Sequence, residues 1–149
     1  MTASIATNQT ILVVGGGISG MTAALEAAEC GKQVILVEKT PVLGGRTARL
    51  YRYFPKMCHP TCGLEINLRR LKQNRNVRLM TMTEVTAVSG SRGNYEVTLK
   101  VSPRYVNENC TACGKCGEAV SAEVSNPWNY GLDKMKAAYL PHNMAHPQR

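Results

Sequence analysis

The feature that most constrains the fold is a run of glycines between an apolar stretch and an alanine-rich stretch. Residues 11–14 are aliphatic and mostly β-branched, which is typical of a buried strand. The strand pattern stops at three consecutive glycines, and a helical pattern follows over residues 21–30. Strand, glycine turn and helix in this order predict the first half of a Rossmann-like βαβ unit that binds a dinucleotide.

The glycines have the spacing G-x-G-x-x-G, and each position has a physical reason. Gly15 permits the tight turn, Gly17 lets a pyrophosphate approach the backbone, and Gly20 lets the helix pack closely on the strand. Backbone N–H groups of the first helical residues, Ile18 and Ser19, would face the phosphates at the positive end of the helix dipole.

A second strand pattern covers residues 33–38 and ends in Glu38, about 20 residues after the glycines, where a carboxylate binds ribose hydroxyls. A Gly-Gly pair follows six residues later. An acid followed by such a pair resembles the FAD site of the two-dinucleotide-binding flavoproteins, and so favours FAD over NAD. The cofactor contacts expected on this side are Lys39, Gly44, Gly45 and Arg46.

Charge and hydropathy narrow the class of protein. The net charge is +8, and residues 39–78 contain ten basic residues and one acid, which indicates a solvated face, an anionic cofactor or an acidic protein partner. No aromatic interleaving or helix-turn-helix pattern supports nucleic-acid binding. No run of 18 apolar residues indicates a membrane span, and residues 1–10 do not resemble a secretory signal, so a cytoplasmic location is expected.

The remaining pattern is α/β with a β-hairpin. Residues 41–63 are punctuated by glycine and proline and are expected to form a loop. The further elements expected are a helix over 64–73, a strand over 77–82, a hairpin from 84–89 and 95–101, and a short helical stretch over 132–139. We expect two units: a nucleotide-binding part over residues 1–105 and a small insertion and tail over 106–149.

Three cysteines carry the chemistry of the insertion. Cys110, Cys113 and Cys116 have the spacing C-x2-C-x2-C, which is typical of thiolates that bind one iron–sulfur cubane. The ferredoxin pattern would continue with a cysteine at position 120, where this chain has Val120. A zinc site or unliganded thiols are the alternatives.

Three thiolates require a fourth ligand, and an earlier loop offers two. Cys58 and Cys62 both precede the basic helix, and the sequence does not decide between them. His59 is a further conceivable ligand. The alternative is that Cys58 and Cys62 form a redox-active disulfide.

Taken together, these motifs resemble the A-type subunit of heterodisulfide reductase, in its shorter sulfur-oxidation or quinone-modifying forms. The similarity rests on residues 13–20, on Gly44-Gly-Arg46 with the stretch 53–58, on residues 103–106 with the cysteine triplet, and on residues 136–142. The chain departs from the family pattern at Val120, where the family commonly has a fourth cysteine. Family members are longer, so the resemblance also implies further sheet strands from more sequence or from a partner chain.

The resemblance implies FAD and one [4Fe-4S] cluster in an electron-transfer subunit. Its partners would be the other subunits of a complex that handles disulfides, sulfane sulfur or quinones, and a homo-oligomer is expected. No catalytic acid, base or nucleophile can be identified, so the chemistry would belong to the cofactors. The alternatives are a non-catalytic nucleotide-binding or zinc-stapled scaffold and a thiol–disulfide oxidoreductase that uses Cys58 and Cys62.

Overall fold

The computed structural model describes residues 10–106, 109–142 and 144–145. The expectation about a secretory signal therefore lies almost wholly outside the described residues. The helices and strands, in chain order, are β1 (Ile11–Val14), α1 (Ile18–Glu29), β2 (Val34–Val37), η1 (Thr47–Arg49), α2 (Thr61–Gln73), β3 (Val77–Met80), β4 (Thr83–Ser91), β5 (Asn94–Val101), α3 (Lys115–Ala119), β6 (Glu123–Ser125), η2 (Pro127–Asn129) and β7 (Lys134–Lys136).

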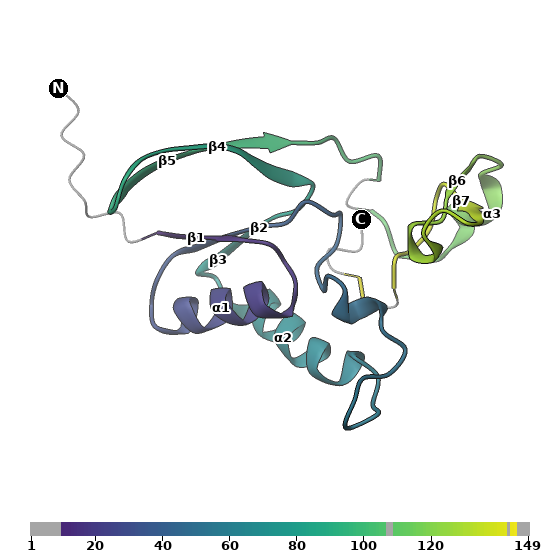
Figure 1. Cartoon of the computed structure of the whole chain (residues 1–149), viewed down its shortest axis with the longest axis horizontal. Coiled ribbons are helices and arrows are strands. Elements are labelled where there is room, and N and C mark those ends of the chain that lie inside the picture. The colour runs from purple at the N-terminus through teal and green to yellow at the C-terminus, as the bar shows by residue number, and fades with distance from the viewer. Residues whose placement is uncertain (1–9, 107–108, 143, 146–149) are drawn as a thin grey trace.

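A three-stranded parallel sheet organises the fold, with strand order β1-β2-β3. Val34 of the central strand pairs with Ile11 on one side and Val77 on the other. Helices α1 and α2 lie on one face of this sheet, and the β4–β5 hairpin lies across the opposite face (Figure 1). The expected α/β fold with a Rossmann-like βαβ unit and a hairpin is confirmed.

The hydrophobic core lies between the sheet and the two helices. Both helices bury a stripe of side chains at spacings of three and four residues, which is the pattern of a helix with one apolar face. The buried residues are Met21, Ala24, Leu25 and Ala28 of α1, and Leu64, Leu68 and Leu71 of α2. Full burial of each large side chain stabilises the fold by about 1.5–3 kcal/mol, so this layer fixes α1, and with it the glycine turn.

Ionic contacts join the outer surfaces of the two helices. The Arg70 guanidinium of α2 donates to Glu29 at 2.8 Å and to Glu26 at 3.1 Å, both on α1. Both glutamates are exposed and Arg70 is half-buried, so these ion pairs contribute little net stability.

The part of the chain after β5 differs from the sequence-based expectation. The prediction of a short helix over 132–139 is wrong, because this stretch contains β7, which pairs with β6 in an antiparallel hairpin. The turn that joins these strands suits a hairpin: the Asn126 carbonyl accepts from the Gly131 N–H at 2.8 Å, and Gly131 has a φ of 78°. This hairpin and α3 form a small unit at one end of the molecule (Figure 1).

Strand β1 lies at one edge of the described sheet. In the usual doubly wound order, the first strand is internal and pairs with a further strand on its other side. Here Ile11 and Val14 are 39% and 63% exposed. Separately, no helix in the described part of the chain is long and apolar enough to cross a membrane.

Candidate cofactor site

The glycine turn joins β1 to α1 and is fixed on both sides. Gly15 has a φ of 102°, a conformation that favours glycine, and its N–H donates to the Val37 carbonyl at 2.7 Å. A Cβ built on Gly20 would collide with the Gly15 carbonyl oxygen. Position 20 therefore requires glycine for α1 to approach the turn this closely.

The space next to Gly17 is open. Gly17 precedes α1 with φ −72° and ψ −176°, and no side chain caps the first turn of the helix. A Cβ built on Gly17 would meet no described atom within 4 Å. Ile18 and Ser19 are exposed at this helix start, where the first backbone amides have no carbonyl partner within the helix. An anionic group can therefore approach bare N–H donors here.

Glu38 lies directly after β2, and its buried carboxylate faces the turn. Its Oε2 accepts from the Gly16 N–H at 2.5 Å, and its Oε1 accepts from the Thr40 N–H at 2.7 Å and from the Thr40 hydroxyl at 2.8 Å. A carboxylate has about four acceptor positions, so Glu38 both braces the turn and keeps acceptor capacity for a hydroxyl group.

The Gly-Gly pair lies over the glycine turn. Gly44 and Gly45 have φ values of 116° and 55°, and the Gly44 N–H donates to the Gly16 carbonyl at 2.9 Å. A Cβ built on Gly45 would be 3.1 Å from the Gly17 Cα. The structure therefore brings the two glycine motifs of the sequence together into one cradle, which we call the glycine cradle: Gly15, Gly16, Gly17, Gly44 and Gly45.

Lys39 and Arg46, the two basic residues expected at this site, differ in their surroundings. Lys39 is exposed and pairs with Glu84 of β4 at 2.6 Å, and this ion pair raises the pKa of Lys39 and lowers that of Glu84. Its ammonium group is thus directed to the hairpin. Arg46 directly precedes η1, next to the cradle in sequence.

The sequence pattern did not single out two residues of the site, Gly16 in the cradle and Thr40 beside Glu38. A Cβ built on Gly16 would collide with Leu43 Cδ2 and approach Glu38, so this middle glycine is sterically required. Thr40 orients Glu38 through two hydrogen bonds. The signals available were the third glycine in the run and a threonine two residues after the acid.

The predicted metal ligands do not converge. All six cysteines are free thiols. Among the described residues, no group of three or more His, Cys, Asp or Glu side chains could hold a metal ion. The residues present therefore do not show a preformed cluster site.

The local settings of the five predicted ligands differ. The Lys115 N–H and the Thr111 hydroxyl donate to Cys113, and together they lower the pKa of its thiol. Cys58 is half-buried, and its backbone forms an isolated antiparallel β-bridge with Tyr53. Cys62 is exposed in the first turn of α2.

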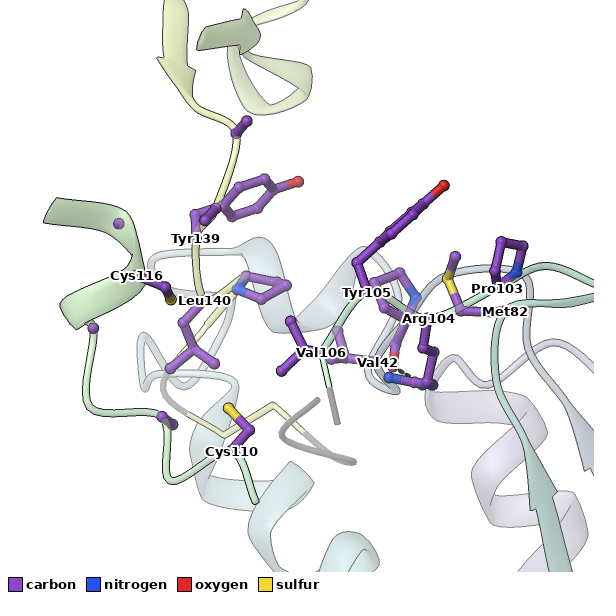
Figure 2. Close-up of a pocket in the computed structure, with 17 residues that line it drawn as sticks. Val42, Met82, Pro103, Arg104, Tyr105, Val106, Cys110, Cys116, Tyr139 and Leu140 are labelled. Carbon is purple, nitrogen blue, oxygen red and sulfur yellow. Dashed lines mark hydrogen bonds between the residues drawn. The ribbon is translucent and has the colours of Figure 1, made fainter. Parts of the chain in front are cut away.

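Cys110 and Cys116 line a cavity of about 480 Å³ between the end of β5 and the small unit. Its walls are mostly apolar, and Val106, Tyr139 and Leu140 line it together with the two cysteines (Figure 2). The cavity thus brings two of the three triplet cysteines to one surface, while Cys113 does not line it.

The segment that contains the glycine cradle is similar to known FAD-dependent oxidoreductases. Residues 10–61 match the family described as FAD dependent oxidoreductase. Among solved structures, L-proline dehydrogenase from P. horikoshii is similar in fold, with a TM-score of 0.52 and 22% identity over 62% of this chain and 20% of that one.

Curated relatives cover nearly the whole chain. The second of two iron-sulfur A-type subunits of CoB–CoM heterodisulfide reductase from Methanopyrus kandleri is 43% identical over 91% of this chain and 21% of its own length. The corresponding protein of Methanocaldococcus jannaschii is 42% identical over 94% of this chain and 22% of its own. The chain spans about a fifth of the length of these relatives. We conclude that it is a homologue of the A-type subunits of heterodisulfide reductase, and that its glycine cradle lies in an FAD-dependent oxidoreductase fold.

Proposed function

We propose that this chain binds FAD in the glycine cradle and serves as an electron-transfer subunit of a heterodisulfide-reductase-like enzyme. The observation that carries the proposal is the open space next to Gly17 at the uncapped start of α1, with Gly45 packed close to the Gly17 backbone. The match of residues 10–61 to FAD dependent oxidoreductases supports FAD as the dinucleotide.

The cradle and the residues next to it have distinct roles in this proposal. The amides of Ile18, Ser19 and Gly20 bind the pyrophosphate, and Glu38 accepts from the adenosine ribose. Gly45 and Arg46 lie along the phosphate or ribityl side of the flavin. Bound FAD supplies two-electron redox chemistry, while the chain's residues bind and orient it.

The iron–sulfur part of the proposal rests on the cysteine spacing and on the relatives, whose names call them iron-sulfur subunits. We propose that Cys110, Cys113 and Cys116 bind one [4Fe-4S] cluster with Cys58 or Cys62. Because these thiols do not converge in the described structure, binding requires the segments to come closer. The partners would be other subunits of a complex that acts on disulfides, sulfur compounds or quinones.

Among the described strands β1 pairs only with β2, which supports a further strand on the other side of β1. We propose that this strand comes from more sequence or from a partner chain, since exposed apolar residues on an edge strand favour pairing.

The substitution Gly17→Ala tests FAD binding directly. The backbone angles of Gly17 suit alanine, and the new methyl group meets no described atom, so folding should be unchanged. The methyl would occupy the space where the pyrophosphate must approach. We expect the Kd for FAD, measured by flavin fluorescence, to rise by at least about tenfold, which corresponds to about 1.4 kcal/mol.

The matched control is Gly63→Ala, whose added methyl also meets no described atom but lies in α2. It should bind FAD like the unaltered chain. Equal affinities for Gly17→Ala and the unaltered chain would contradict binding over Gly17.

A further inference from the structure

The chain returns to the glycine cradle after passing the cysteines. Residues 137–142, which we call the return segment, begin beside α3, where a Cβ built on Gly117 would be 3.1 Å from the Ala138 carbonyl oxygen. Tyr139 and Leu140 then line the cavity that Cys110 and Cys116 also line (Figure 2). The segment ends at His142, which contacts the loop that carries the Gly-Gly pair.

His142 holds one particular peptide group of that loop. Its Nε2 lies 3.1 Å from the Leu43 carbonyl oxygen, and because a carbonyl only accepts, Nε2 carries the hydrogen. The N–H of the same peptide group belongs to Gly44 and donates to Gly16 at 2.9 Å. The Leu43–Gly44 peptide is therefore bonded on one side to the glycine turn and on the other to His142.

The surroundings of His142 favour this arrangement. The imidazole is half-buried, and a Cβ built on Gly44 would be 3.6 Å from Nε2. The Leu43 side chain is fully buried in the core, so the loop cannot easily rotate away. Burial, and to a lesser extent the nearby Arg49, lower the pKa of His142 despite the opposing effect of the bond to Leu43, which favours the neutral imidazole as the donor.

A second contact holds the other end of the loop. The Arg49 guanidinium of η1 lies over the Trp128 ring of η2, 4.2 Å from its centroid. Such cation–π contacts contribute attraction at partly exposed sites. The loop from Leu43 to Arg49 is thus held at both ends by residues from beyond the cysteine triplet.

We propose that His142 is a positioning residue for FAD, which fixes the Leu43–Gly44 peptide so that Gly45 stays over Gly17. The inference rests on the proposed FAD site, and it adds that the segment after the cysteines completes that site. Preorganising a binding loop raises affinity because less order is lost on binding.

The test compares His142→Ala with His142→Gln in the full chain. Alanine removes the donor, while a glutamine amide can donate from nearly the same place. We expect the Kd for FAD to rise about fivefold in His142→Ala, the effect of one hydrogen bond, and to be restored in His142→Gln. Leu132→Ala, at an exposed position of the same tail, is the matched control and should bind FAD normally.

A second readout needs no cofactor. Hydrogen exchange of the Gly44 amide in the FAD-free chain should be faster in His142→Ala and normal in His142→Gln and Leu132→Ala. Unchanged Gly44 exchange and unchanged affinity in His142→Ala would overturn the positioning role. If the unaltered chain binds no FAD while Gly44 exchange still responds, the FAD proposal fails but the contact between His142 and the loop stands.

Discussion

At the residue scale, the environment of His142 predicts a pH dependence of stability. Burial, and then the positive charge of Arg49, lower the pKa of His142 below its ordinary value of 6.5, against the opposing effect of the bond to Leu43. The unfolded chain therefore binds this proton more readily than the folded chain. The stability that neutral His142 contributes is present above pH 6.5 and is lost as the pH falls through the folded pKa.

We expect the free energy of unfolding in urea to fall between about pH 7.5 and 5.5 more steeply for the unaltered chain than for His142→Gln. Leu132→Ala, at an exposed position that carries no titratable group, should keep the slope of the unaltered chain. Equal slopes for the unaltered chain and His142→Gln would mean that His142 does not titrate as its surroundings indicate.

The position of a candidate site residue along the chain is easier to predict than the direction of its side chain. Glu38 follows from strand length and spacing, and it does face the glycine turn. Lys39 is its neighbour, yet it pairs with Glu84, which is 45 residues away in sequence (84 − 39). The direction of a side chain at a strand end depends on which residues pack against it. The sequence pattern predicts the hairpin that carries Glu84, but not that this hairpin lies next to Lys39.

At the element scale, the contact between α1 and the glycine turn can be tested by one methyl group. In Gly20→Ala the new Cβ would collide with the Gly15 carbonyl oxygen, so the helix or the turn must shift. We expect a loss of about 1–3 kcal/mol in the free energy of unfolding, typical of an overpacked site. Urea unfolding at neutral pH measures it.

Gly63→Ala gives the opposite expectation in α2, because its methyl meets no described atom and alanine favours the helix by about 0.5–1 kcal/mol. A Gly20→Ala chain as stable as the unaltered one would show that α1 does not depend on this close approach.

Long periodic elements can be predicted well from the sequence and short ones poorly. Helix α2 and the β4–β5 hairpin follow from their apolar periodicity, whereas the predicted helix over 132–139 is wrong and the stretch contains β7. Strand β7 has three residues, too few to show a period of two. Its structure depends on pairing with β6, and the Asn126 side chain fixes the intervening turn by accepting from the Trp128 N–H at 2.9 Å.

At the scale of the whole molecule, the glycine cradle is formed, whereas no three of the described predicted metal ligands form a group that could hold a metal ion. The cradle depends on close backbone contacts along 15–45, which glycine spacing encodes directly. Convergence of Cys58 or Cys62 with the triplet depends on how two segments that are distant in sequence approach each other. Spacing within the triplet indicates the metal chemistry, but it contains no information on that approach.

The last prediction concerns these cysteines. If the proposed cluster forms, anaerobic reconstitution with iron and sulfide should give about four iron atoms per chain and a broad brown absorption. Cys113→Ser should lose most of the iron, because it removes the middle thiolate of the triplet. Cys30→Ser is the matched control, since Cys30 is an exposed thiol at the end of α1 and should keep the iron.

The segment with Cys58 and Cys62 is tested in the same way, with Cys58→Ser and Cys62→Ser. Loss of iron in one of them would identify the fourth ligand and show that this segment meets the triplet in the loaded protein. Full iron in both would exclude them as required ligands and would leave a redox-active disulfide as their proposed role. A colourless chain that binds zinc in place of iron would contradict the electron-transfer role and favour a scaffold, because zinc has no redox chemistry with which to pass electrons from FAD.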